Sequence, residues 1–145
     1  MVLQTTMYQK QNIDPSSAPW TMHEFFAGSG LVSYGLKGMF APIWANDISK
    51  QKAAVYEANF GCDRFVLDDI KNIHGRNLPF AHLSWASFPC QDLSLAGSIG
   101  GIHASRSGLV WEWLRVLDEM KSKPKILLLE NVTGLLSTNN GNNYR

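Results

Sequence analysis

The sequence predicts an α/β fold in which helices cover both faces of a doubly wound, mostly parallel sheet. Strand-like apolar runs alternate with segments of helical character along the 145 residues, an order that is typical of right-handed βαβ units. A second observation is the run "ILLL" at 126–129, which is as continuously apolar as a parallel strand covered on both faces. With 45% hydrophobic residues, a chain of this length is expected to form one domain with a core of its own.

Short apolar runs indicate the strands, and longer mixed segments between them indicate the helices. The clearest helix pattern places Val110, Trp113, Leu114 and Leu117 at i, i+3, i+4 and i+7, which predicts one apolar face. Lysines followed by Pro124 mark the end of that helix. Strands are expected at 22–28, 42–47, 64–70, 81–90 and 125–132, and helices at 31–40, 49–61 and 108–123.

The two ends of the chain are expected to differ from the domain between them. Residues 1–20 are rich in Pro, Ser, Gln and Asn and are interpreted as a flexible leader. At the other end, "GLLSTNNGNNYR" stands where a further helix should begin, so the sheet is predicted to be incomplete at the C-terminus. A partner chain or a further C-terminal half would complete it.

Composition excludes several classes of protein. No apolar run approaches the roughly 20 residues that span a membrane, and the N-terminus lacks the pattern of a secretory signal, so we expect a cytoplasmic protein. A net charge of +1 does not by itself indicate a nucleic-acid partner. Cys62 and Cys90 are too few for a disulfide framework, and the four histidines lack zinc-ligand spacing, so no metal site is expected.

A glycine-containing turn follows the first predicted strand in "EFFAGSGLVSYG". Gly28 and Gly30 would let the backbone approach a ligand closely, and the amide groups of the following helix could bind it. The dinucleotide-binding fingerprint requires a third glycine where this chain has Ser33. The alternative interpretation is a tight turn without a ligand.

Acidic residues at the ends of the next two strands strengthen the case for a nucleoside cofactor. Asp47 lies about 20 residues after the glycines, where a carboxylate accepts hydrogen bonds from ribose hydroxyls. Asp69 and Ile70 end the third strand and could hold an adenine by an edge hydrogen bond and an apolar face. For this pair, a cap at the end of the strand is an equally good interpretation.

Cys90 and Glu130 are the candidate catalytic residues. In a doubly wound sheet the first and fourth strands are neighbours, so Cys90, at the end of the fourth, is expected beside the glycine turn. That position favours a nucleophile over a structural thiol, whereas Cys62 is interpreted as structural. Glu130 ends the fifth strand after four apolar residues, and poor solvation there would favour its protonated form. A solvated glutamate at the end of a strand is the alternative.

These residues resemble the cytosine carbon-5 DNA methyltransferases, which use S-adenosylmethionine and have a Rossmann-like methyltransferase fold. The resemblance runs from about His23 to the C-terminus and is strongest in "FFAGSG", "SFPCQDLSLAG", "SRSGLVWEWLRVL" and "PKILLLENVTGLL". It implies that residues 21–145 are the N-terminal part of the catalytic domain. It also implies a set of residues lining the cofactor site: Phe26, Ala27, Gly28, Gly30, Asp47, Ile48, Asp69, Ile70, Pro89 and Leu109.

The resemblance further implies a reaction. The Cys90 thiolate would add to carbon 6 of a cytosine rotated out of double-stranded DNA, and Glu130 would hold the base while carbon 5 is methylated. S-adenosylhomocysteine would be the second product. The segment "QDLSLAGSIGGIHASRSG" is interpreted as a loop that closes over the base, with Arg106 as a phosphate contact.

The sequence departs from the family's pattern in two respects. Leu31 replaces a frequent glycine after the turn, and the family's later arginine-bearing strand, target-recognition region and last helix are missing. We therefore expect a second polypeptide to carry them, as in a split or truncated restriction–modification methyltransferase, near the nucleoid if the source is bacterial. The alternatives are a tRNA cytosine-5 methyltransferase and a non-catalytic fragment that binds the cofactor or regulates. A nicotinamide oxidoreductase would leave Pro89, Cys90 and Gln91 unexplained.

Overall fold

The computed structural model of this chain describes residues 18–89 and 108–133. Several predictions fall outside these ranges, among them the nucleophile Cys90, the phosphate contact Arg106 and the closing loop. Most of the expected leader also lies outside, and the first strand already begins at Trp20.

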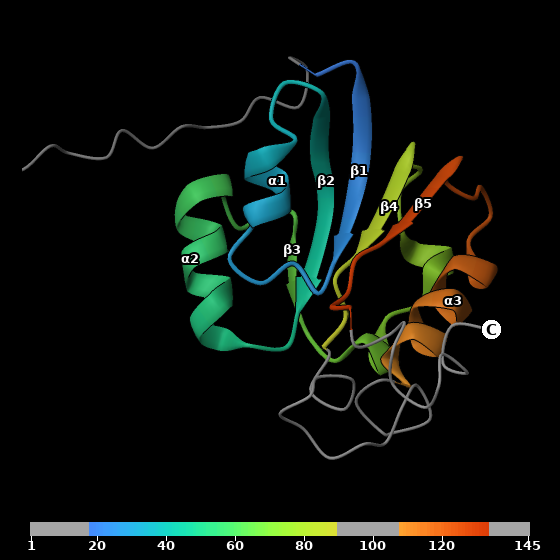
Figure 1. Cartoon of the computed structure of the whole chain (residues 1–145). Helices are drawn as coiled ribbons and strands as arrows, with labels where there is room; N and C mark the ends of the chain where they lie inside the picture. The colour runs from blue at the N-terminus through green and yellow to red at the C-terminus, as the bar shows by residue number, and fades with distance from the viewer. Residues whose placement is uncertain (1–17, 90–107, 134–145) are drawn as a thin grey trace, which may run out of the picture.

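The described residues form one sheet of five parallel strands in the order β3-β2-β1-β4-β5. The order confirms the doubly wound arrangement, because winding proceeds outward from β1 to β3 and then returns to β4 on the other side of β1. Figure 1 shows the strands side by side. They are β1 (Trp20–Phe25), β2 (Phe40–Asp47), β3 (Phe65–Leu67), β4 (Leu83–Ala86) and β5 (Ile126–Leu129).

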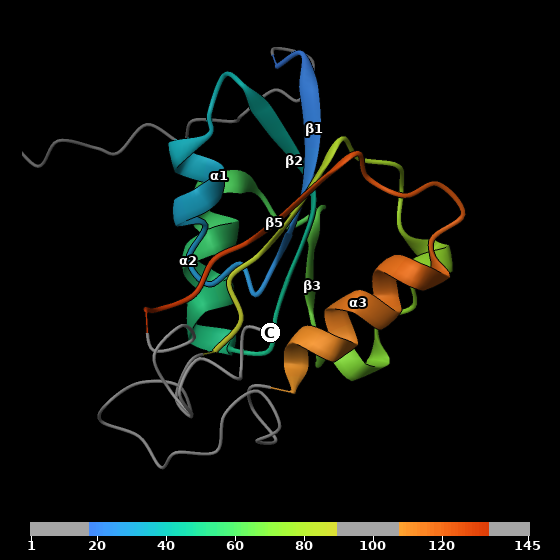
Figure 2. The same ribbon diagram turned by 45° about the vertical axis from the view of Figure 1, so that its right-hand side comes forward.

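Helices cover the sheet on both sides. Two views show α1 and α2 on one face and α3 on the other (Figures 1 and 2). Two short 3-10 helices, η2 and η3, take the place of a crossover helix between β3 and β4 and pack against α3. The helices are α1 (Leu31–Gly35), α2 (Lys50–Phe60), α3 (Leu109–Glu119), η2 (Ile70–Asn72) and η3 (Gly75–Asn77).

Local sequence accounts for the ends of the helices. The Ser49 side chain accepts a hydrogen bond from the Lys52 amide and caps the start of α2. Gly61 ends α2 with a φ of 85°, a conformation that favours glycine. Helix α3 ends at Glu119, a few residues before the predicted stop. It buries Trp113, Val116 and Leu117, so the prediction of Leu114 on the buried face was wrong.

Two apolar clusters hold the layers together. Between the sheet and α3, Phe25, Trp44 and Ala86 pack with Trp113, Val116 and the two isoleucines of the η2 region. Between the sheet and α2, the cluster consists of Ala27, Ala45, Tyr56 and Phe60. The end of β1 therefore lies between two packed layers, which leaves little freedom for the turn that follows it.

Strand β5 differs from its prediction. All four of its residues are exposed, from 36% at Leu128 to 53% at Leu127, although the apolar run predicted cover on both faces. The physical reason is its place in the sheet. Within the described residues β5 is the last strand of the sheet and pairs only with β4.

Candidate functional site

The carboxyl ends of β1, β2, β4 and β5 lie next to one another at one end of the sheet. Phe25 pairs with Asn46 on one side and with Ala86 on the other, and Ala86 pairs with Leu129. Because the strands are parallel, the residues that follow them emerge at the same edge. This arrangement brings together the predicted glycine turn, Asp47 at the end of β2, and Glu130 after β5, as the sequence led us to expect.

Asp47 ties the glycine turn to the end of β2. Its Oδ2 atom accepts a hydrogen bond of 2.9 Å from the Gly28 amide, and its Oδ1 atom accepts one of 2.9 Å from the Ser49 amide. The side chain is buried, with 8% exposed. Each carboxylate oxygen has a second lone pair, so the group can hold the turn and still accept hydrogen bonds from a ligand.

Phe26 has a backbone conformation that the sequence did not reveal. Its φ is 56°, which makes it the one described residue other than glycine with a positive φ. Strain of this kind is stored at functional sites more often than elsewhere. The Phe26 side chain packs against the cluster that contains Ile70, and so does Leu109. Three of the predicted apolar contacts of the cofactor, distant in sequence, therefore meet on one cluster.

The two glycines of the turn have different roles. Gly28 has a φ of 57°, and a Cβ atom there would meet only the Lys52 Cδ atom, at 3.9 Å. Gly30 has a φ of 85°, and a Cβ atom there would lie 2.4 Å from Cε2 of Phe60 and 2.9 Å from Cδ2 of Tyr56. Gly28 leaves open space beside the turn, whereas Gly30 lets the turn pack closely on α2.

The remaining predicted cofactor residues each follow a different strand, from β1 to β4. Asp69 caps η2, because its Oδ1 atom accepts a hydrogen bond of 3.0 Å from the Lys71 amide, and its contact with an adenine stays a prediction. Ile48 is 68% exposed and Ala27 is buried. Pro89 is half-buried at the last described position before Cys90.

Glu130 lies where the topology predicted it, but its surroundings differ. Its amide donates a hydrogen bond of 2.9 Å to the Ala86 carbonyl, which places it beside the end of β4. Its side chain is exposed, and the apolar residues before it do not enclose it. The expected poor solvation is therefore not provided by the described residues, since β5 lies at the edge of the sheet.

Asn131 was not singled out from the sequence. Its side-chain amide donates a hydrogen bond of 3.0 Å to the Phe88 carbonyl. This bond joins the segment after β5 to the segment after β4, one residue from Pro89 and beside Glu130. The signal was a polar amide directly after the predicted acid, but a single sequence does not indicate where that amide is directed.

Two ionisable residues of β1, His23 and Glu24, are buried, which the sequence did not predict. His23 Nε2 donates a hydrogen bond of 2.9 Å to the Pro79 carbonyl, and Glu24 accepts one from the Ser33 hydroxyl. The Ser33 hydroxyl also lies 3.3 Å from the Tyr56 hydroxyl. Burial lowers the pKa of His23 to about 4 and raises the pKa of Glu24 to about 7, and their hydrogen bonds offset only part of these shifts.

These two shifts predict opposite effects of pH on stability. An acid whose pKa is raised on folding stabilises the fold below its ordinary value, here 4.5, and this contribution is lost as pH rises through about 7. The His23 contribution is instead lost as pH falls from 6.5 to about 4. The unfolding free energy of the protein relative to its Glu24→Gln variant should therefore fall by about 3 kcal/mol between pH 4.5 and 7. Urea denaturation of both proteins across this range measures the difference, and a difference independent of pH would contradict the prediction.

No three His, Cys, Asp or Glu side chains in residues 18–89 and 108–133 are grouped so that they could hold a metal ion. None of the helices in the same part of the chain combines the length and the apolar character that crossing a membrane requires. Cys62, interpreted as structural rather than catalytic, is exposed and follows Gly61 at the end of α2.

Comparisons with known proteins agree with this geometry. The family of C-5 cytosine-specific DNA methylases matches residues 20–145. The Type II methyltransferase M.Bsp6I of Bacillus sp. (strain RFL6) is 36% identical over 83% of this chain and 38% of its own length. For M.BsuFI of Bacillus subtilis, also a Type II methyltransferase, the values are 34%, 95% and 32%. The crystal structure of S. pombe Dnmt2 methyltransferase shares the fold, with a TM-score of 0.67 and 24% identity over 87% of this chain and 40% of that one. This chain thus spans about a third of the length of these curated relatives.

Proposed function

The chain belongs to the family of C-5 cytosine-specific DNA methylases, and we propose that it supplies the part of such an enzyme that binds S-adenosylmethionine and carries the nucleophile. The observation that carries the proposal is that two groups of residues lie together at the carboxyl ends of the strands. One group is the turn held by Asp47, and the other is Glu130 beside the end of β4. In this proposal the substrate is a cytosine in double-stranded DNA.

The described residues fit the proposed cofactor. The Asp47 carboxylate, which lies against Gly28, would accept hydrogen bonds from the ribose hydroxyls. The apolar cluster that joins Phe26, Ile70 and Leu109 would take the adenine ring. The open position beside Gly28 leaves room for a ligand at the turn. Ala27, Gly30, Ile48, Asp69 and Pro89 complete the proposed cofactor set.

The proposed chemistry rests on two side chains. The Cys90 thiolate would add to carbon 6 of the cytosine, and Glu130 would bond the ring nitrogen and so offset the charge that develops in the ring. The addition makes carbon 5 electron-rich. The cofactor, when bound, supplies the methyl group that carbon 5 takes up. Loss of the carbon 5 proton then returns the electron pair to the ring and expels the Cys90 thiolate. Arg106 would contact a phosphate of the DNA.

A second polypeptide that carries the target-recognition region is part of the proposal. Strand β5 supports it, because within the described residues it is an edge strand whose apolar side chains, Ile126 to Leu129, are exposed. Isolated proteins rarely leave such a surface open.

Two other functions use the same residues. A tRNA cytosine-5 methyltransferase would need the same nucleophile and acid, and a non-catalytic fragment would need only the cofactor pocket. The residues at the carboxyl ends of the strands favour neither the tRNA enzyme nor the non-catalytic fragment over DNA methylation. The family match, to C-5 cytosine-specific DNA methylases, favours DNA.

Covalent capture tests the proposal and separates the alternatives. DNA duplexes and tRNA containing 5-fluorocytosine would be incubated with S-adenosylmethionine and the chain, alone and with the C-terminal part of M.Bsp6I. Fluorine replaces the proton that must leave carbon 5, so the adduct persists and is seen on a denaturing gel. We expect capture of DNA with the added part and near-background capture by the chain alone. Capture of tRNA only would favour the RNA enzyme, and cofactor binding without capture would favour the non-catalytic fragment.

A further inference from the structure

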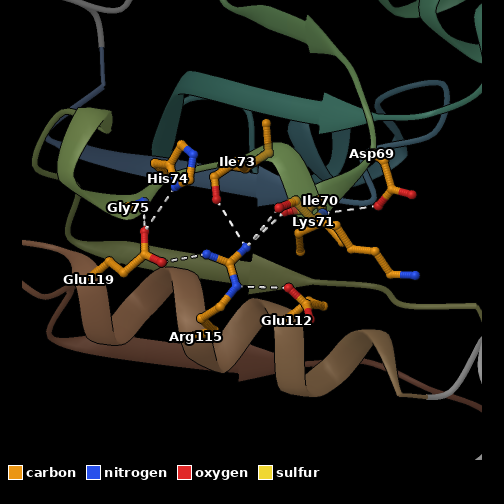
Figure 3. A network of polar contacts seen from close by, with 9 residues as sticks. All are labelled: Asp69, Ile70, Lys71, Ile73, His74, Gly75, Glu112, Arg115 and Glu119. Atoms are coloured by element: carbon orange, nitrogen blue, oxygen red, sulfur yellow. Dashed lines mark hydrogen bonds and ion pairs between the residues drawn. The ribbon is translucent and has the colours of Figure 1, made fainter.

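Arg115 of α3 makes a set of contacts that the proposed chemistry does not use. Its Nε and Nη1 atoms donate hydrogen bonds to Glu112 and Glu119 of the same helix, at 2.8 and 2.5 Å. Its Nη2 atom donates to three backbone carbonyls across the helix surface, those of Ile70 at 3.2 Å, Ile73 at 3.1 Å and Lys71 at 3.4 Å. Figure 3 shows the guanidinium between the two carboxylates and directed at this segment.

The arrangement holds the backbone of residues 70–73 in place. The three carbonyls belong to η2 and the residue after it, a short turn that has few hydrogen bonds of its own. The two carboxylates fix the plane of the guanidinium, so that its remaining hydrogens are directed at the carbonyls. Hydrogen bonding with Arg115 also keeps the pKa of Glu119 below its ordinary value, which keeps that carboxylate charged.

A second hydrogen bond holds the chain against α3, just after residues 70–73. Glu119 Oε2 accepts a hydrogen bond of 2.9 Å from the Gly75 amide. At Gly75 a Cβ atom would lie 1.9 Å from the Val116 carbonyl oxygen, so the chain has no space to lie closer to the helix. Ile70 and Ile73 are buried in the cluster with Val116. These contacts hold the chain at Gly75, while Arg115 orients the carbonyls of Ile70, Lys71 and Ile73.

Stability alone does not explain the Arg115 network. The Arg115 side chain is 33% exposed and its two carboxylate partners are 30% and 31% exposed. Ion pairs this exposed contribute little to the unfolding free energy, and the burial of Ile70, Ile73 and Val116 contributes more. What the network adds is the orientation of the backbone that carries Asp69 and Ile70.

We propose that Arg115 is a positioning residue for cofactor binding, which fixes residues 69–73 so that Asp69 and Ile70 meet the adenine. The inference rests on the proposed function. It also gives α3 a place in the site, since the same helix begins at Leu109, which packs on the cluster that contains Ile70. Without Arg115 the segment would have to be ordered when the ligand binds, and the affinity would fall.

A conservative variant tests the inference by binding rather than by activity. Arg115→Lys keeps the charge but cannot span two carboxylates and three carbonyls. The dissociation constant of S-adenosylhomocysteine would be measured by calorimetry for the full chain. We expect it to rise roughly tenfold, as for the loss of about one to two hydrogen bonds, with little change in melting temperature. Lys123→Met is the matched control, because Lys123 pairs with Asp118 at 2.6 Å, and its affinity should be unchanged.

A double-mutant cycle separates positioning from general destabilisation. Asp69→Asn retains the oxygen that caps η2 but alters the group offered to the adenine. If Arg115 acts through this segment, Arg115→Lys should weaken binding less in the Asp69→Asn background than in the wild type. Two results would overturn the inference: an equal effect of Arg115→Lys on the dissociation constant in both backgrounds, or equal dissociation constants for Arg115→Lys and Lys123→Met. In either case, binding by the wild type would still support the proposed cofactor. Absence of binding by the wild type would overturn both.

Discussion

Replacing Cys90 by serine is expected to reduce covalent capture of 5-fluorocytosine DNA to background. The thiolate is the nucleophile in the proposed addition to carbon 6, and a serine hydroxyl is almost entirely protonated at neutral pH and is far less nucleophilic. The comparison uses the same denaturing gel, with the C-terminal part of M.Bsp6I present in every lane. Calorimetry with S-adenosylhomocysteine should give an unchanged dissociation constant.

The chain offers its own control for this experiment. Cys62 is exposed and lies after α2, away from the edge where the strand ends meet. Cys62→Ser should therefore leave capture unchanged. An adduct that persists undiminished in Cys90→Ser, or one that disappears in Cys62→Ser, would mean that the nucleophile has been assigned to the wrong residue.

Gly30→Ala is expected to lower the unfolding free energy by about 3 kcal/mol. A positive φ costs an L-residue roughly 1 to 2 kcal/mol. Overpacking against the Phe60 and Tyr56 rings, which the new Cβ atom would meet at 2.4 and 2.9 Å, adds roughly 1 to 3 kcal/mol. Such a loss is a large share of the stability of a domain of this size. Because the turn would have to move, affinity for S-adenosylhomocysteine should fall as well.

Chemical denaturation followed by circular dichroism measures this loss. Gly35→Ala is the control, because Gly35 belongs to α1 and a Cβ atom there would meet nothing within 4 Å. Alanine is the better helix former, so this variant should be as stable as the wild type or slightly more stable. If the two variants unfold at the same urea concentration, the close packing of the turn on α2 does not determine its stability.

Periodicity and local motifs predicted most of the elements. The five strands and three α-helices lie where the apolar runs and the Trp113 face indicated, although their ends differ by a few residues. The strand order confirmed that the glycine turn and the end of β4 are neighbours. These features are predictable because they depend on backbone hydrogen bonding and on handed crossovers, which act in the same way in many sequences.

The exceptions share a cause. The run at β5 has the composition of a covered strand, yet β5 is exposed at the edge of the sheet in the described residues. Leu114 fits the periodicity of α3, yet Val116 is buried instead, because the η2 region defines which side of the helix is covered. In each case the sequence pattern indicated which side chains could be buried. The neighbouring segments determined which side chains are buried.

The sequence by itself determined the class of fold, the order of its elements and the residue types of the proposed site, Cys90, Asp47 and Glu130 among them, since these depend on local pattern and motif. Only the tertiary structure decided how the site is supported: Asp47 against Gly28, the strained backbone of Phe26, and Arg115 against the carbonyls of residues 70–73. These contacts join residues far apart in the chain. Their geometry depends on how whole layers pack, and no single segment of sequence contains that information.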